Sequence, residues 1–369
     1  MATKEDFDIL VQNAGLGCRM RLEEYSAEVQ NGYAGWKAAI DDLISCATRS
    51  VPRMPPINFD FVFNGRVNVF AAFEKGEFFM GVTTGATYML QTVFLRMLAD
   101  RRLFPKIGSP NRERDDLPLL PNFFDDADLM HYNYESRCVP QDPLRGRYAL
   151  HLFDQALWFL IGHEIAHISL GHCGYHASQF HGAQLVELGW TPDSVEKKLE
   201  RQTLEMIADS RSAFSRVSSV IHTAEIENGK EWQWKPGKVE GWDDLLFETA
   251  FAVHTLFRIF GEESFNKVHV DQNPYPPVAL RRMMLDCGFL YAVQRLHKSG
   301  KLERARSIIA TARKNADLCI AHILGVPANL EDLETAYTEE GGAHFHKLQC
   351  VWNYELKDKV TPYAFEFGP

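Results

Sequence analysis

The sequence predicts an α+β protein, in which a small antiparallel or mixed sheet precedes a predominantly helical remainder. Three short runs of strand-type residues, separated by turn signals, lie between residues 57 and 83. After them, apolar residues recur at helical spacing in the segments 154–173, 194–218, 242–260 and 300–325. Strand signals early in the chain and helical signals later are typical of this class.

Composition narrows the class of protein. Of the 369 residues, 46% are hydrophobic and 24% are charged, which is typical of a soluble globular chain with enough apolar material for a core. The formal net charge of −10 argues against a nucleic-acid partner. The seven cysteines contain no Cys-x-x-Cys pair, which predicts reduced thiols and a cytoplasmic location. The polar start shows no secretory signal, and the apolar run Thr87–Leu98 is too short to span a bilayer, so we expect no membrane partner.

We expect three segments along the chain. Residues 1–55 form a helical segment, in which the spacing of apolar side chains predicts one buried face, residues 56–300 form the main domain, and residues 301–369 form a C-terminal helical extension. The four side chains of that buried face are Trp36, Ile40, Leu43 and Ile44. Within the main domain, the proline-rich and acidic stretch 102–147 reads as an insertion. It would act as a lid, as an inhibitory segment or as surface decoration.

The early strands predict a meander. Asn64-Gly65 is the strongest short hairpin signal available, and Glu74-Lys75-Gly76 is a second turn. A helix should follow over residues 85–100. The three predicted strands are Ile57–Phe63, Val67–Phe73 and Glu77–Thr83.

The run His163-Glu164-Ile165-Ala166-His167 is the central chemical motif. Two imidazoles four residues apart on a helix lie about 40° apart around its axis, so they can share one metal ion. Glu164 projects beside them, within reach of a water. Gly171 is placed to end the helix, and zinc is the natural ion for two imidazoles. The alternative is a buried helix whose histidines only satisfy local hydrogen bonds.

A third ligand is needed for a catalytic zinc site. The metzincin pattern fails, because Cys173 stands where that family has its third histidine and Leu170 where it has a glycine. The run Glu205-Met206-Ile207-Ala208-Asp209 on the predicted helix 194–218 resembles the gluzincin pattern Glu-x-x-Ala-Asp. That resemblance implies Glu205 as the third ligand and Asp209 as the acceptor of a ligand histidine's N–H. A charged pair on a solvated helix is the alternative.

The order of these elements resembles zincin metallopeptidases of the gluzincin kind, over roughly residues 55–290. The stretches 67–73 and 80–85 are similar to segments before the active helix in the CAAX-prenyl-protease and HtpX families. Those families are membrane-embedded, so the chain looks closer to the phage-exclusion (Lit-type) bacterial peptidases. The resemblance implies a zincin core, one Zn²⁺ ion, Glu164 as general base, a protein or peptide substrate and a role in phage defence. A regulatory protein partner stays open.

The resemblance also implies substrate contacts. Zincins of this kind bind an extended substrate along an edge strand, and Val69, Phe70 and Ala71 are the candidates here, with ordinary sheet packing as the alternative. Tyr275 stands where the family usually has histidine, and Arg281 and Arg282 follow it. An arginine here would bind a substrate carbonyl or pair with an active-site acid, unless both are solvated residues at a helix start.

A second histidine cluster follows the motif. His172, His176 and His181 are candidate transition-state donors or accessory ligands, with polar loop residues as the alternative.

The predicted function is hydrolysis of peptide bonds by a zinc-dependent endopeptidase. A competing function is a catalytically silent zincin scaffold that acts as a binding or regulatory module. Such a structural site would recruit a fourth protein ligand, for which Cys173 or His176 would serve. A metal-dependent hydrolase with a non-peptide substrate is a third possibility.

Overall fold

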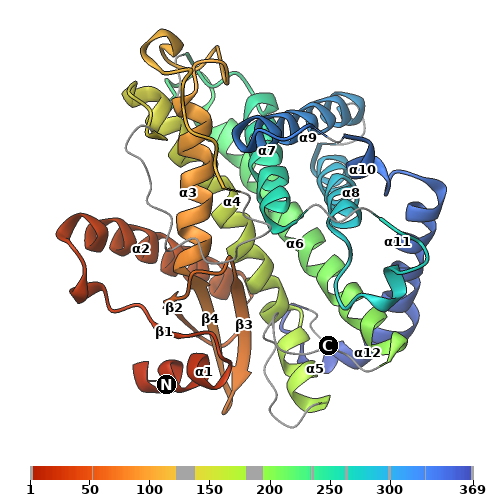
Figure 1. Ribbon diagram of the computed structural model, residues 1–369. Helices are drawn as coiled ribbons and strands as arrows, with labels where there is room; N and C mark the ends of the chain where they lie inside the picture. Colours follow the sequence, from red (N-terminus) through yellow and green to blue (C-terminus); the bar gives the residue numbers. More distant parts are fainter. Residues whose placement is uncertain are drawn as a thin grey trace.

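The computed structural model describes residues 3–51, 53–121, 138–179, 194–232, 234, 237–261, 265–297, 301–328 and 330–366. Helices predominate. One small mixed sheet lies at one side with α1, α2 and α3, and α4 runs between this part and the helices α6 to α9 (Figure 1). The predicted α+β class is therefore confirmed. The strands are β1 (Cys18–Arg19), β2 (Ile57–Phe63), β3 (Val69–Glu74) and β4 (Glu77–Thr83).

The α-helices cover most of the rest of the chain. They are α1 (Lys4–Asn13), α2 (Ala27–Ser50), α3 (Thr84–Ala99), α4 (Pro143–Ser169), α5 (His172–Gln179), α6 (Val195–Glu227), α7 (Asp243–Phe260), α8 (Val278–His297), α9 (Leu302–Leu324), α10 (Leu330–Glu334), α11 (Glu339–Val351) and α12 (Lys357–Val360). Among the described residues, no helix combines the length and the apolar character that crossing a bilayer requires.

The sheet has the strand order β1-β2-β4-β3, so the predicted antiparallel meander is wrong. Strand β2 pairs in parallel with β4, and only β3 and β4 form a hairpin. That hairpin turns at Lys75-Gly76, where both residues have positive φ (51° and 84°), as a two-residue turn requires. The predicted second turn is confirmed, and β3 is left at the edge of the sheet.

Asn64-Gly65 does not form a hairpin, because Asn64 binds other parts of the chain. Its side chain donates to the Leu16 carbonyl (2.8 Å) and accepts the Arg66 amide (2.8 Å). Its carbonyl accepts the Gly85 amide (2.8 Å) at the start of α3. Asn64 therefore directs the chain past the first turn of α3, so that β3 reaches the far side of β4.

Helix α4, which carries the metal-binding motif, begins earlier than predicted. Asp142 caps it by accepting the amides of Leu144 and Arg145, and Pro143 occupies the first turn. The last residues of the predicted insertion 102–147 therefore belong to this helix, and residues 122–137 of that insertion lie outside the described part. At the other end Gly171 has φ +85°, which confirms it as the residue that ends the helix.

The other predicted helices are present with shifted ends. Helix α6 begins where it was predicted, with Ser194 as its cap, but it continues to Glu227 instead of ending near residue 218. Helix α9 ends at Gly325 in the left-handed conformation. On α2, Ile40 and Ile44 are buried and Trp36 and Leu43 pack against them, which confirms the predicted face.

One large apolar cluster joins these elements. It contains buried side chains of the sheet, α3, α4, α7 and α9, and extends along the chain from Met20 to Leu324. The N-terminal segment and helix α9 therefore pack on the central part of the chain. The last described residues also dock on α4, because the Phe365 amide donates to the Ser169 carbonyl (2.8 Å).

Arg145 is a fully buried cation that organises the chain after α3. Its guanidinium donates five hydrogen bonds of 2.7–3.0 Å, all to backbone carbonyls. The acceptors are Leu98, Asp100, Leu103, Phe104 and Ile107. The planar fork of arginine can satisfy this many acceptors, and lysine cannot. The start of α4 is thereby fixed against the end of α3.

We expect Arg145→Ala to lower the free energy of unfolding by at least about 3 kcal/mol, because it leaves several buried carbonyls without donors. Arg145→Lys should recover only a small part of that loss. The exposed neighbour Arg147→Ala is the control and should change stability by about 0.5 kcal/mol or less. Urea unfolding followed by circular dichroism measures all three. Equal midpoints for the Arg145 and Arg147 variants would contradict the assigned role.

Candidate metal centre

Helices α4 and α6 bring the three predicted ligands together. The Nε2 atoms of His163 and His167 are 3.0 Å apart, one helical turn from each other on α4. Glu205 reaches them from α6, with Oε2 3.4 Å from His163 Nε2 and Oε1 3.7 Å from His167 Nε2. The three ligand atoms lie within 4.8 Å of one another, and all three side chains are buried.

The donor set fits a zinc ion. Two imidazole nitrogens and one carboxylate are the protein ligands of one common type of catalytic zinc site. Glu205 Oε2 is buried and lies 3.4 Å from His163 Nε2. The guanidinium of Arg281 also approaches this oxygen, with Nη2 at 3.6 Å. A buried carboxylate oxygen is costly unless it is paired or coordinates a metal, so a cation between these three groups would stabilise it.

Burial and the neighbouring charges set the protonation of the ligands. Burial lowers the pKa of His167 far below its ordinary value, which favours the neutral form that a metal requires. Burial also opposes charge on His163, but hydrogen bonds with Asp209 and Glu205 raise its pKa well above normal. Burial alone would raise the pKa of Glu205, yet the hydrogen bond from His163 and the charge of its neighbours lower it, so this carboxylate is anionic. Metal binding requires the neutral form of His163, so it would compete with protonation of this ring.

Asp209 accepts the N–H of a ligand histidine, as the sequence predicted. Its Oδ1 lies 2.9 Å from His163 Nδ1, one helical turn beyond Glu205. Arg281 on α8 donates two hydrogen bonds of 2.8 Å to the same carboxylate and stacks on the ring of Phe257, 4.8 Å away. Of the two roles predicted for an arginine here, Arg281 takes the pairing with an active-site acid.

Arg282 is not part of the site, and its predicted substrate contact is wrong. Adjacent residues on a helix point about 100° apart, so Arg282 faces away from Arg281. It is fully buried and pairs with Asp317 of α9 at 2.8 Å. Its role is to hold α8 against α9.

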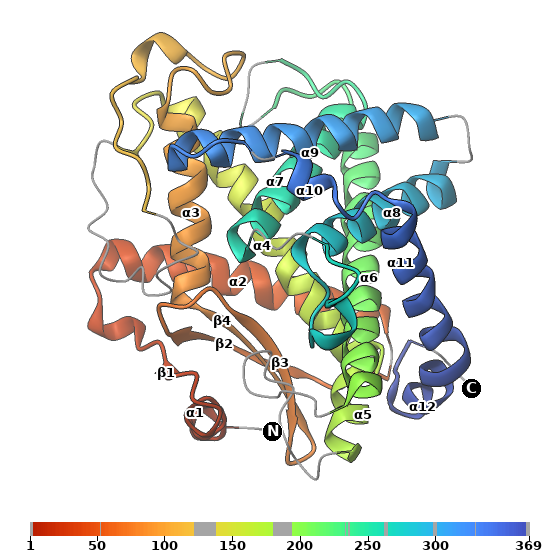
Figure 2. The same cartoon turned by 45° about the vertical axis from the view of Figure 1, so that its right-hand side comes forward.

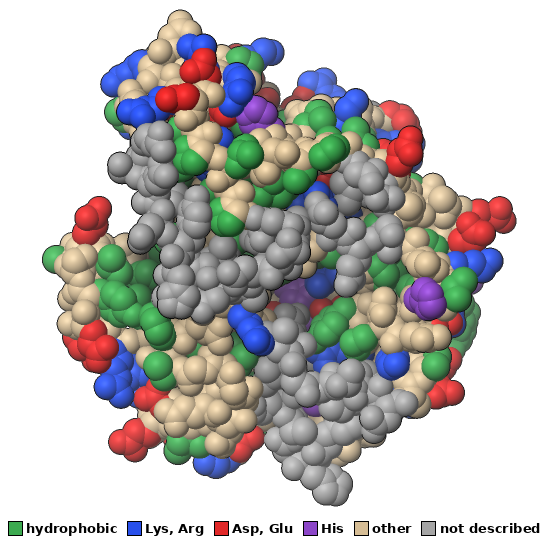
Figure 3. Space-filling view, in the orientation of Figure 1, with side chains coloured by type: hydrophobic (Ala, Val, Ile, Leu, Met, Phe, Trp, Pro, Cys, Tyr) green, Lys and Arg blue, Asp and Glu red, His purple; other side chains and the backbone are tan. Residues whose placement is uncertain are grey.

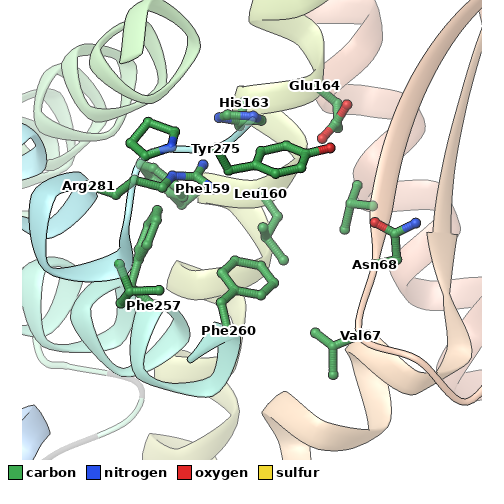
Figure 4. A pocket seen from close by; sticks show the side chains of 13 residues that line it. Val67, Asn68, Phe159, Leu160, His163, Glu164, Phe257, Phe260, Tyr275 and Arg281 are labelled. Carbon is green, nitrogen blue, oxygen red and sulfur yellow. The ribbon is translucent and has the colours of Figure 1, made fainter. Parts of the chain in front are cut away.

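A cleft of about 290 Å³ opens beside the ligands. His163, Glu164, Asn68, Tyr275 and Arg281 supply its polar lining, and Figure 4 shows these side chains around the cavity. The rest of the wall is mainly apolar, contributed by Val67, Val69, Phe159, Leu160, Phe257, Phe260, Pro276 and Val278. In Figure 3 a hollow near the middle of the molecule has histidine and basic side chains at its bottom. Glu164 and Tyr275 therefore both lie in the wall of the cleft beside His163.

The predicted substrate strand borders this cleft only at its start. Val69 lines the cavity, and β3 is the edge strand of the sheet. The Phe70 side chain lies on the other face, where its ring packs 6.4 Å from that of Phe7. Ala71 is buried in the main core. Side-chain contacts from Phe70 to a bound peptide are therefore ruled out, while backbone pairing along β3 stays a prediction.

The described histidines of the second cluster lie in the protein interior, whereas the predicted roles would place them in the cleft or in a surface loop. His172, at the start of α5, is fully buried and does not line the cleft. Its Nδ1 lies 2.9 Å from Nδ1 of His167, on the side of that ring away from the ligand atoms. A transition-state contact from His172 is therefore excluded. His176 is also buried, and His181 lies outside the described residues.

Two residues of the site were not singled out from the sequence. Arg201 precedes Glu205 by one turn of α6, donates to the Tyr275 hydroxyl and lies over its ring, 4.3 Å from the centroid. Arg201 could have been found from its spacing of four residues from Glu205, which places both side chains on one face of the helix. Asn68 is buried in the cleft wall, and its backbone amide and carbonyl both bind Thr83. The signals for Asn68 were its position just before the edge strand and its place in the stretch 67–73.

We expect Glu205→Ala to weaken zinc binding at least about 10-fold, because it removes a direct ligand. Glu225→Ala, an exposed carboxylate on the same helix, is the matched control and should bind zinc like the wild type. Competition with a coloured chelator measures both. Unchanged affinity of the Glu205 variant would mean that the third ligand lies elsewhere.

Comparison of the chain with protein-family models, with curated proteins and with solved structures found no match. The interpretation of the site therefore depends on its own geometry.

Proposed function

We propose that this protein is a zinc-dependent endopeptidase of the gluzincin kind. The observation that carries the proposal is the meeting of three buried ligand atoms within 4.8 Å, beside a cleft that also contains Glu164. In this proposal His163, His167 and Glu205 hold one Zn²⁺ ion. A protein or peptide is the substrate.

Zinc held by this donor set supplies a Lewis acid that activates water and polarises a carbonyl group. Glu164 would take the proton of the attacking water and deliver it to the leaving amine. Its place directly after His163 puts its carboxylate in the cleft. The Tyr275 hydroxyl, held by Arg201, would donate a hydrogen bond to the developing oxyanion. Arg281 acts indirectly by holding Asp209 against His163.

The number of ligands among the residues that the structure describes supports an enzyme over a silent scaffold. A structural zinc site normally has four protein ligands. Among the residues that the structure describes, the candidate group contains three, and neither Cys173 nor His176 joins it. A carboxylate beside the ligands, facing a cleft, also has no use in a purely structural site. A binding or regulatory module is therefore the weaker alternative.

The narrower proposal is a soluble peptidase similar to the phage-exclusion type, with a zincin core. The element order supports it, because the mixed sheet, α3, the helix with the histidines and the helix with Glu205 follow one another along the chain. A cytoplasmic site of action fits the seven cysteines, all of which are free thiols. Phage defence and a regulatory partner belong to the same proposal.

We expect Glu164→Gln to bind zinc with the affinity of the wild type and to lose hydrolysis by a factor of about 10² or more, because it removes the general base and no ligand. Mapping of new protein termini in cells that express each form identifies the cleaved proteins and measures the loss. A variant that cleaves as the wild type does would refute the base assignment.

The apolar wall predicts the kind of residue beside the scissile bond. Phe260 lies at the end of α7, partly exposed, so its removal should leave the core intact. We expect Phe260→Ala to raise KM about 10-fold for peptides that have a large apolar residue beside the scissile bond. The change in kcat should be smaller. Peptides taken from the mapped cleavage sites serve as substrates. Equal KM values for apolar and small residues in the wild type would show that this wall binds no side chain.

A further inference from the structure

His172 is the buried histidine that the proposed mechanism does not use. Its side chain is fully buried, and its Nδ1 lies 2.9 Å from Nδ1 of His167. The other nitrogen of the His167 ring, Nε2, faces His163 and Glu205 at 3.0 and 3.7 Å. The two nitrogens of His167 therefore face two different partners, the ligand cluster and His172.

When a metal occupies the site, this arrangement allows only one placement of the ring protons on His167 and His172. A neutral imidazole that binds metal through Nε2 carries its proton on Nδ1. Nδ1–H of His167 then donates, so Nδ1 of His172 must accept and the proton of His172 must be on Nε2. With the opposite tautomer of His167, a proton on Nε2 would point into the metal site.

We propose that His172 is the positioning residue of the ligand His167, and that it fixes both the tautomer and the ring orientation of that ligand. The inference rests on the proposed metal site. It gives the two histidine ligands different supports, because His163 is oriented by the carboxylate of Asp209 and His167 by a neutral imidazole. Glu205 and Asp209 already bring two negative charges to this region, offset in part by Arg281. A neutral acceptor such as His172 orients His167 without adding a third negative charge.

The C-terminal segment holds His172 in place. Gly171, with φ +85°, ends α4 so that His172 begins α5 and folds back toward His167. The backbone of residues 363–364 lies against Gly171, where an added Cβ would come within 2.6 Å of it. Glu366 accepts from Ser169 Oγ (2.8 Å), and the Trp352 ring lies 6.2 Å from that of His172. Figure 2 shows α5 and α12 together beside the lower end of α6. The tail thus supports the end of the ligand helix.

The test compares His172→Leu, which removes the acceptor, with His172→Asn, whose Oδ1 can replace it. We expect the Leu variant of the full-length protein to bind Zn²⁺ about 10 to 100-fold more weakly, as loss of an orienting partner does, and the Asn variant to recover most of that affinity. Chelator competition measures affinity, and the absorption spectrum of the Co²⁺-loaded protein reports the coordination geometry. His344→Leu is the control, because it also removes a buried, hydrogen-bonded histidine, which binds Gln202 at 2.9 Å.

A second measurement needs no variant. Long-range ¹H–¹⁵N spectra of the zinc-loaded wild type should show His167 protonated on Nδ1 and His172 on Nε2. The opposite tautomer for either ring would overturn the inference, and so would wild-type affinity in the Leu variant. Equal weakening by Leu and Asn would show that packing matters and the acceptor does not, which also overturns it. A wild type that binds no zinc would refute the proposed function, and this inference with it.

Discussion

The close contact between α4 and α6 is the constraint on which the site depends. Gly162 allows it, because a Cβ there would lie 2.8 Å from Ser212 Oγ, which instead donates to the Phe159 carbonyl (2.7 Å). Gly162 directly precedes His163, so the approach of the two helices sets the distance between His163 and Glu205.

The same contact places several ionisable groups in the protein interior. His163, His167, Glu205 and Asp209 are each 3% exposed or less. Such groups are tolerated only when they satisfy one another or hold a cation. Arg281 brings in α8, and the apolar cluster around α4 supplies the rigid surroundings. Their mutual contacts thus offset the free energy that burying these charged groups costs. An ion between the ligands would stabilise them further.

The remaining polar groups extend the network outward. The Tyr275 hydroxyl is held by Arg201, and His167 is held by His172. The last described residues close this network, since Glu366 binds both Ser169 on α4 and Arg211 on α6. A segment that carries no chemical motif therefore contributes to the geometry of the candidate centre by joining the end of α4 to the middle of α6.

The sequence by itself determined what depends on near neighbours in the chain. Two histidines four residues apart share a helix face, Gly171 and Ser194 mark helix ends, and Lys75-Gly76 closes a hairpin, because each follows from local backbone geometry. Only the tertiary structure decided which faces meet. The parallel pairing of β2 with β4 and the pairing of Arg282 on α8 with Asp317 on α9 depend on packing between separate segments, and no local pattern encodes that packing.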